Sequence, residues 1–157
     1  MDLGLKNKVA IITGGSDGIG KAAAISIAKE GGKVAIVGRT QSKIDSAIND
    51  IKIDTHNDVI GISADVSIES EVQNMVNEVI SKFGQIDILI NNAGTSAATT
   101  LEKMTDEQLK IDFGIKVYGG VYCARAVLPH LKKSGSGVII NTTTPGGKAS
   151  GPGGQPT

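Results

Sequence analysis

The chain has 157 residues, and its 16 Lys and Arg residues balance its 16 Asp and Glu residues, so the formal net charge is zero at pH 7. This length suits a single domain with its own core, and the balanced charge argues against binding to nucleic acid. Hydrophobic residues make up 39% of the chain, which excludes a disordered protein. The sequence contains neither a signal-peptide pattern nor an apolar run long enough to span a membrane. We therefore expect a cytoplasmic protein without a membrane partner.

Five short runs of mostly β-branched residues predict β-strands. They cover residues 9–12, 33–37, 59–62, 86–90 and 138–140. Most of these runs lack the polar alternation of a half-exposed strand, so we expect strands that are mostly buried on both faces.

Helical patterns separate the predicted strands. Apolar residues recur at helical spacing over residues 72–83, and we expect Ser67 to cap this helix and Gly84 to end it. Thr105 and Gln108 form a capping-box pattern, which predicts the start of another helix.

A further helical segment covers residues 115–131, where we expect Pro129 to bend or end the helix. The repeated alternation of strands and helices predicts an α/β fold with right-handed parallel crossovers. The expected architecture is a Rossmann-type doubly wound parallel sheet that is truncated after the fifth strand. Residues 1–144 would form this domain, and residues 145–157, with five Gly and three Pro, would be a Gly/Pro-rich loop or a truncated end.

A glycine-rich segment joins the first predicted strand to the first predicted helix, as in dinucleotide-binding loops. Gly14 permits a sharp turn, Gly18 lets backbone N–H groups approach a pyrophosphate, and Gly20 lets the helix lie close to the strand. The alternative is an ordinary tight turn between a strand and a helix. If the segment binds a nucleotide, the contacting residues would be Gly14, Ser16, Asp17, Gly18, Ile19 and Gly20.

Three motifs follow one another at the ends of predicted strands. They are Thr-Gly-x-x-x-Gly-Ile-Gly at residues 13–20, Asp-Val at residues 65–66 and Asn-Asn-Ala-Gly at residues 91–94. In this order and context the chain resembles the short-chain dehydrogenase/reductase family along nearly its whole length. Ligands of such folds bind outside the carboxyl ends of the strands, where all three motifs lie.

The resemblance implies a role for each of these motifs. Asp65 would meet the adenine amino group with help from the Val66 backbone, and Asn91, Ala93 and Gly94 would line the adenosine ribose and stabilise the sheet. Without the resemblance, Asp65 is an ordinary turn residue and residues 91–94 are a plain turn. The implied activity is hydride transfer between a nicotinamide cofactor and a small carbonyl or alcohol substrate, in a homodimer or homotetramer of the full-length chain.

The end of the second predicted strand bears on the type of cofactor. An NAD enzyme usually places a carboxylate there, on the ribose 2′-hydroxyl, but residues 32–43 contain none. Arg39, followed by Thr40, can instead pair with a 2′-phosphate. We therefore favour NADP(H), with NAD as the alternative and with a solvated strand-end cation as the other reading of Arg39. Asp17 argues mildly against NADP(H), because many NADP-using relatives place a basic residue there.

The catalytic pattern of the family is only partly present. Its Tyr-x-x-x-Lys unit does not occur in the sequence, and the next expected residue after its serine is that Tyr, at about position 158. The alignment puts Thr144, with Thr143 as the alternative, at the position of the catalytic hydroxyl. Lys116 stands where the family often has Asn, and it either supports proton transfer or is simply solvated. Tyr118 and Tyr122 do not match the catalytic position.

We expect no metal site, because the single cysteine, Cys123, cannot form a Cys-based zinc centre and suits the core instead. The chain by itself is expected to be catalytically poor. A nucleotide-binding or regulatory module without catalysis is the alternative to an oxidoreductase, and a scaffold that binds no nucleotide is a third reading. With nothing beside it, the fifth strand would be an exposed edge that favours association.

Overall fold

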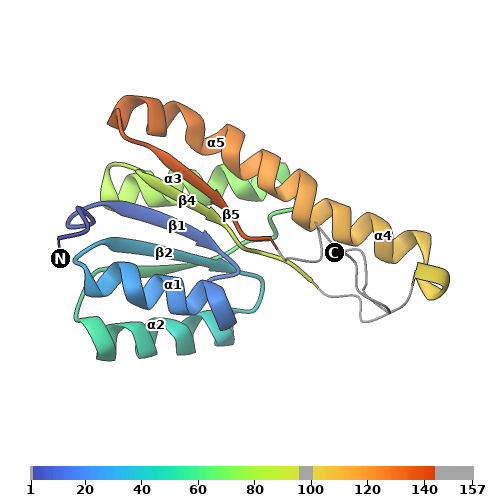
Figure 1. Cartoon of the computed structure of the whole chain (residues 1–157), viewed down its shortest axis with the longest axis horizontal. Helices are drawn as coiled ribbons and strands as arrows, with labels where there is room; N and C mark the ends of the chain where they lie inside the picture. Colours follow the sequence, from blue (N-terminus) through green and yellow to red (C-terminus); the bar gives the residue numbers. More distant parts are fainter. Residues whose placement is uncertain (1, 96–100, 144–157) are drawn as a thin grey trace.

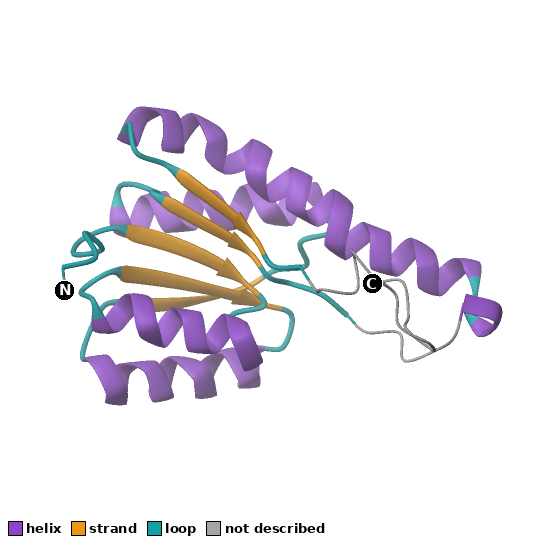
Figure 2. Cartoon of the chain, viewed as in Figure 1, coloured by secondary structure: helices purple, strands orange, loops and turns teal. Residues whose placement is uncertain are grey.

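The computed structural model describes residues 2–95 and 101–143. They contain a five-stranded parallel sheet in the order β3-β2-β1-β4-β5 (Figure 1, Figure 2). The strands are β1 (Val9–Thr13), β2 (Lys33–Gly38), β3 (Val59–Ser63), β4 (Ile88–Asn91) and β5 (Val138–Asn141). The predicted α/β fold with a parallel sheet is confirmed, although β4 begins two residues later than the predicted strand.

Helices flank the sheet on both faces (Figure 2). They are α1 (Gly18–Lys29), α2 (Gln41–Thr55), α3 (Glu69–Phe83), α4 (Asp106–Phe113) and α5 (Gly119–Ser134), with a 3-10 turn at Leu101–Lys103 and a π-helical turn at Gly114–Tyr118. One core cluster joins α1 and α2 to the sheet, and the other joins α3 and α5 to its opposite face. This doubly wound arrangement agrees with the predicted architecture.

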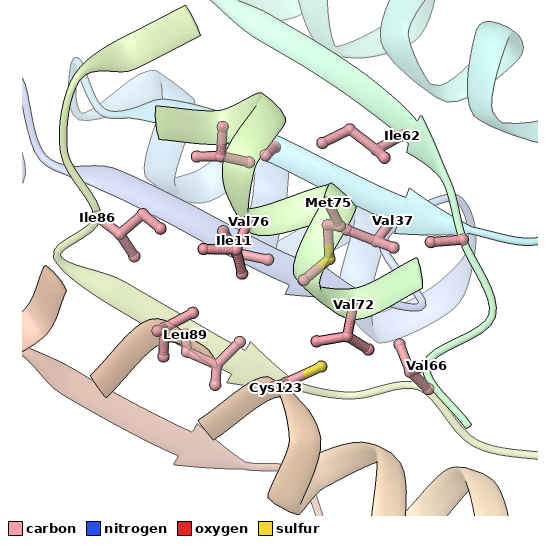
Figure 3. Close-up of a cluster of buried hydrophobic side chains, with 14 of the residues drawn as sticks. Ile11, Val37, Ile62, Val66, Val72, Met75, Val76, Ile86, Leu89 and Cys123 are labelled. Carbon is pink, nitrogen blue, oxygen red and sulfur yellow. The ribbon is translucent and has the colours of Figure 1, made fainter. Parts of the chain in front are cut away.

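Strand β1 supplies side chains to both clusters in turn. Val9 and Ile11 belong to the cluster with α3 and α5, while Ala10 and Ile12 belong to the cluster with α1 and α2. Successive side chains of a strand point to opposite faces, so a strand covered on both faces is aliphatic throughout. Figure 3 shows Cys123 beside Leu89 and Val72 in the cluster with α3 and α5. Burial raises the pKa of the Cys123 thiol to about 12, which fits its expected place in the core.

One expectation about helix ends is wrong. Ser67 does not cap α3, because its N–H and its hydroxyl both donate to Oδ1 of Asp65, and Ile68 takes the cap position instead. Of the two effects expected of Pro129, an end of the helix is excluded because α5 continues to Ser134, while a bend stays a prediction. The predicted end of α3 at Gly84 and the capping box at Thr105 are confirmed.

Strand β5 is exposed, unlike the other strands of the sheet. Val138, Ile139 and Ile140 are 47%, 37% and 47% exposed, so the described residues leave this apolar strand largely uncovered, as expected. The helices in the described ranges are too short or too polar to cross a lipid bilayer. The predicted Gly/Pro-rich segment, residues 145–157, lies outside the described residues.

Candidate functional site

A cavity of about 530 Å³ opens at the carboxyl ends of the strands. The order of the sheet places β4 on the other side of β1 from β2, so the segments that follow β1 and β4 leave the sheet in different directions. A crevice at such a reversal is the usual ligand site of an open α/β sheet. Most of the predicted cofactor residues line this cavity. They are Gly14, Ser16, Asp17, Gly18, Arg39, Thr40, Asp65, Val66, Ala93 and Gly94.

The loop between β1 and α1 depends on its glycines. Gly14 has φ +64° and Gly18 has φ +52°, which is the left-handed region that side chains disfavour. A β-carbon at Gly20 would collide with the carbonyl oxygen of Gly14, whereas one at Gly18 would meet nothing within 4 Å. The loop therefore packs tightly on its inner side and stays open beside the cavity, at the positive end of the α1 dipole.

Residues after β4 hold this loop in place. The side-chain amide of Asn92 donates to the carbonyl oxygens of Thr13 and Gly14, each at 3.2 Å. The Thr13 hydroxyl oxygen accepts from the backbone N–H groups of Asn92 and Ala93, each at 3.0 Å. Two of the three motifs are thus joined by hydrogen bonds across the site. Asn92 lines the cavity although the sequence did not single it out.

Asp65 lies at another wall of the cavity with a well-satisfied carboxylate. Oδ1 accepts from the Ser67 hydroxyl at 2.7 Å and from the Ser67 N–H at 2.9 Å, and Arg39 Nη1 lies 3.9 Å from Oδ2. Partial burial opposes ionisation, but these hydrogen bonds and the arginine outweigh it, so the pKa of Asp65 is below its ordinary value. Asp65 is therefore an anionic acceptor at neutral pH.

Two cations line the cavity near the end of β2. Arg39 was predicted, whereas Lys43, in the first turn of α2, was not. Lys43 Nζ lies 3.8 Å from Oδ2 of Asp17, whose Oδ1 accepts a 2.8 Å bond from the Gly18 N–H. Helical spacing from the end of β2 is a signal that could have found Lys43, because the first turn of a helix lies beside the strand end that precedes it.

Lys116 lies in the π-helical turn between α4 and α5, where sequence reasoning foresaw an ordinary helix. Its Nζ donates to Oδ2 of Asp112 at 3.0 Å, and Oδ1 of Asp112 accepts a 2.6 Å bond from the Thr95 hydroxyl. The Thr95 bond, reinforced by Lys116, lowers the pKa of Asp112 against the opposing effect of burial. Thr95 itself lines the cavity. Such π-helical turns are frequent at functional sites.

The stem of Lys116 also approaches the cavity. A β-carbon built on Gly94, which lines the cavity, would lie 3.7 Å from Cε of Lys116. The ammonium group is therefore near the cavity wall, although Lys116 is not part of the lining. Asp112 had no signal in the sequence beyond its spacing of four residues from Lys116, which is that of a helical ion pair.

Three predicted cofactor residues, Ile19, Gly20 and Asn91, are not part of the cavity wall. Ile19 is 71% exposed, and Gly20 is buried against the loop. The Asn91 side-chain amide donates to Oδ1 of Asn141 at 2.9 Å, which links the ends of β4 and β5. Thr144 lies outside the described residues.

The chemistry of the cavity wall suits a nicotinamide dinucleotide. The cavity volume is in the range of small-molecule sites, and the wall combines an open glycine loop at a helix N-terminus with Asp65 and Arg39. Backbone N–H groups at a helix N-terminus bind phosphate, and a carboxylate accepts from an amino group. The described residues contain no cluster of His, Cys, Asp or Glu suited to a metal ion.

Sequence comparison gives two findings. A family model for short chain dehydrogenase matches residues 8–156. The 3-oxoacyl-(acyl-carrier-protein) reductase of Staphylococcus epidermidis is 34% identical over 148 residues, which cover 94% of this chain and 60% of that protein. The chain spans between 55% and 60% of the length of the curated relatives that it matches.

Solved structures share the fold. L-sorbose reductase from Gluconobacter frateurii, complexed with NADPH and L-sorbose, has a TM-score of 0.85 and 37% identity, covering 90% of this chain and 54% of that one. NAD+-bound xylitol dehydrogenase has a TM-score of 0.89 and 26% identity, covering 96% of this chain and 58% of that one. The neighbours include one structure with NADPH and one with NAD+.

Proposed function

The chain belongs to the short-chain dehydrogenase family, and we propose on this basis that it binds a nicotinamide dinucleotide for hydride transfer to or from a small carbonyl or alcohol substrate. One observation supports the proposal most. Three segments that are far apart in the sequence, the glycine loop, residues 65–66 and residues 93–94, line the same cavity at the carboxyl ends of the strands. For the full-length protein we further propose a homodimer or homotetramer.

Each part of the dinucleotide has a proposed partner. The pyrophosphate would bind at the loop after β1, which lines the cavity through Gly14, Ser16 and Gly18 at the N-terminus of α1. The adenine amino group would donate to Asp65, an anionic acceptor in the cavity wall. Ala93 and Gly94 would border the adenosine ribose, and Asn91 joins the ends of β4 and β5 through its bond to Asn141.

We propose NADP(H) as the preferred cofactor. Arg39 lines the cavity at the end of β2. Neither β2 nor the first turn of α2 contains a carboxylate. Arginine binds a phosphate through its planar guanidinium, whereas a 2′-hydroxyl calls for a carboxylate acceptor. NAD is the alternative, and the solved neighbours include complexes with each cofactor.

The catalytic roles are assigned to two residues. A bound nicotinamide would supply or accept the hydride that adds to, or leaves, the carbonyl carbon. Thr144 would donate a hydrogen bond to the substrate oxygen through its hydroxyl. Lys116, held by Asp112, would support proton transfer to that oxygen.

A nucleotide-binding module without catalysis is the second candidate. It is favoured by the observation that the Lys116 ammonium is already paired with Asp112 at 3.0 Å. The two candidates differ in turnover. Full-length protein that binds NADPH and oxidises it in the presence of a carbonyl substrate supports the oxidoreductase, and binding without oxidation across a broad carbonyl panel supports the module.

A thermal shift measurement tests nucleotide binding at this cavity. NADPH at about a hundredfold its Kd should stabilise the chain by about 2.7 kcal/mol and raise its Tm. Gly94→Leu should abolish the rise, because Gly94 lines the cavity and its β-carbon direction is open apart from Lys116. Gly120→Ala, on α5, is the control that keeps the rise. Circular dichroism checks that Gly94→Leu is folded, and an unchanged wild-type Tm with NADPH contradicts the proposal.

A further inference from the structure

The hydroxyl of Thr95 lies between the cavity and a buried carboxylate. Thr95 lines the cavity, and its O–H donates to Oδ1 of Asp112 at 2.6 Å. A separation of about 2.5–2.7 Å is typical of a hydroxyl that donates to an ionised carboxylate. The proton of this bond therefore belongs to Thr95, because an ionised carboxylate has no proton to donate.

Lys116 helps to keep Asp112 ionised. Asp112 is 9% exposed, and its Oδ2 accepts from Lys116 Nζ at 3.0 Å, so each carboxylate oxygen has its own donor. The Thr95 bond lowers the pKa of Asp112, burial opposes this effect, and Lys116 lowers the pKa further. At neutral pH the bond between Thr95 and Asp112 thus has a single direction.

This direction makes Thr95 an acceptor toward the cavity. A hydroxyl has one proton to donate and two lone pairs that accept, and Asp112 takes the proton. Asp112 is the hydrogen-bond partner of the Thr95 hydroxyl among residues 2–95 and 101–143. A bond to an anion also polarises the hydroxyl, which strengthens its oxygen as an acceptor for the next group.

We propose that Thr95 accepts a hydrogen bond from a hydroxyl or amino group of the bound dinucleotide, and that Asp112 is the positioning residue that fixes this direction. The inference rests on the proposed nucleotide function, to which it adds a binding side chain. A ligand group that donates is bound at Thr95, whereas a phosphate or carbonyl oxygen placed there would face a lone pair. Lys116 contributes by balancing the charge of Asp112.

Three ligands locate the donor group. Adenosine 2′,5′-bisphosphate contains the adenosine half of NADPH, 2′-phospho-ADP-ribose adds the second ribose, and NADPH adds the nicotinamide carboxamide. Titration calorimetry of the whole chain gives the three Kd values. Thr95→Val keeps the branched shape and removes the hydroxyl, so it should weaken each ligand that contains the donor by about fivefold. Ligands that lack the donor should bind unchanged.

Two further variants separate the hydroxyl from the fold around it. Thr95→Ser should restore wild-type affinity within about twofold, because it restores the acceptor. Thr55, the last residue of α2, does not line the cavity, so Thr55→Val is the matched control and should change no Kd.

Asp112→Asn tests the positioning role. The ammonium of Lys116 needs an acceptor, so the new carbonyl oxygen should face Lys116 and the new amide group should donate to Thr95. The Thr95 proton is then free to turn toward the cavity, and binding should weaken by about threefold. In the Thr95→Val background the same substitution should add nothing, because the hydroxyl on which it acts is absent. Circular dichroism checks that each variant is folded at the temperature of the titration.

The inference is overturned, with the nucleotide site intact, by any of three results. These are unchanged Kd values for all three ligands in Thr95→Val, a Thr95→Ser variant that binds as weakly as Thr95→Val, and an equal effect of Asp112→Asn with and without the Thr95 hydroxyl. A wild-type chain that binds none of the three ligands contradicts the proposed function itself.

Discussion

At the scale of single residues, charge is concentrated where the cavity meets the π-helical turn. Asp112 is 9% exposed, yet it remains ionised because Thr95 and Lys116 both donate to it. Its pKa lies below the ordinary value of 3.8. A carboxylate with a lowered pKa stabilises the fold fully at pH values above its ordinary pKa. This stabilisation is lost as the pH falls through the lowered, folded-state pKa.

Asp112→Asn should therefore destabilise the chain in a pH-dependent way. At pH 7 the variant leaves the Lys116 ammonium without its anion, and the free energy of unfolding should fall by about 1–3 kcal/mol. As the pH falls through the lowered, folded-state pKa, the wild-type carboxylate also loses its charge, so the difference should shrink. Urea unfolding at pH 7 and at an acid pH measures both quantities. Asp54→Asn, at an exposed position on α2, is the control, and an equal loss at both pH values would refute the account.

At the scale of elements, glycines decide how closely the helices approach the sheet. A β-carbon at Gly61, on β3, would overlap the side chains of Ile44 and Ile48 on α2. Gly120, on α5, is different, since its nearest neighbour would be Asn91 at 3.6 Å, an ordinary contact. Substitution by alanine should therefore change the free energy of unfolding in opposite directions at Gly61 and Gly120.

We predict that Gly61→Ala lowers the free energy of unfolding by about 1–3 kcal/mol through overpacking. Gly120→Ala should raise it by about 0.5–1 kcal/mol, because alanine suits a helix interior better than glycine. Chemical denaturation of the two variants and the wild type gives both differences. Equal effects in the two variants would mean that α2 does not pack on β3 as closely as described.

The elements also separate what the sequence could predict from what it could not. Aliphatic runs, the Gly84 end of α3 and the Thr105 capping box depend on local rules, and they were predicted correctly. Ser67 was not, because Asp65 competes for its N–H through a turn that sequence periodicity does not reveal. The π-helical turn at Gly114–Tyr118 inserts one residue into an apparently regular helical pattern.

At the scale of the whole molecule, the location of the cavity could be predicted from the sequence, but the contacts within its wall could not. The order of the motifs at strand ends predicted where a ligand would bind. Asn92 lies within a predicted motif and Lys43 one helical turn after β2, so both had a signal in the sequence, whereas the contact of Thr95 with Asp112 depends on tertiary packing. The structure therefore shows which residues contact the predicted site residues, while the site residues themselves could be predicted from the sequence.

The uncovered face of β5 is also a property of the whole molecule. Val138, Ile139 and Ile140 are exposed on a strand that pairs with β4 among the described residues. Exposed apolar edges favour association between chains. A polypeptide of these 157 residues should elute above its 16.1 kDa mass in size-exclusion chromatography with light scattering. Ile139→Lys should increase the monomer fraction, and a wild-type chain that is monomeric at all concentrations would count against this expectation.

The most direct test of the account is an NMR titration of the isotope-labelled chain with NADPH, because it reports both binding and location. The account predicts saturable shifts of the backbone amide signals around the cavity, at Gly14, Gly18, Arg39, Asp65 and Gly94. Amides on the exposed side of α5, such as that of Leu128, should not move. An unchanged spectrum at millimolar NADPH, or shifts confined to surfaces away from this cavity, would contradict the claim that the chain binds a nicotinamide dinucleotide there.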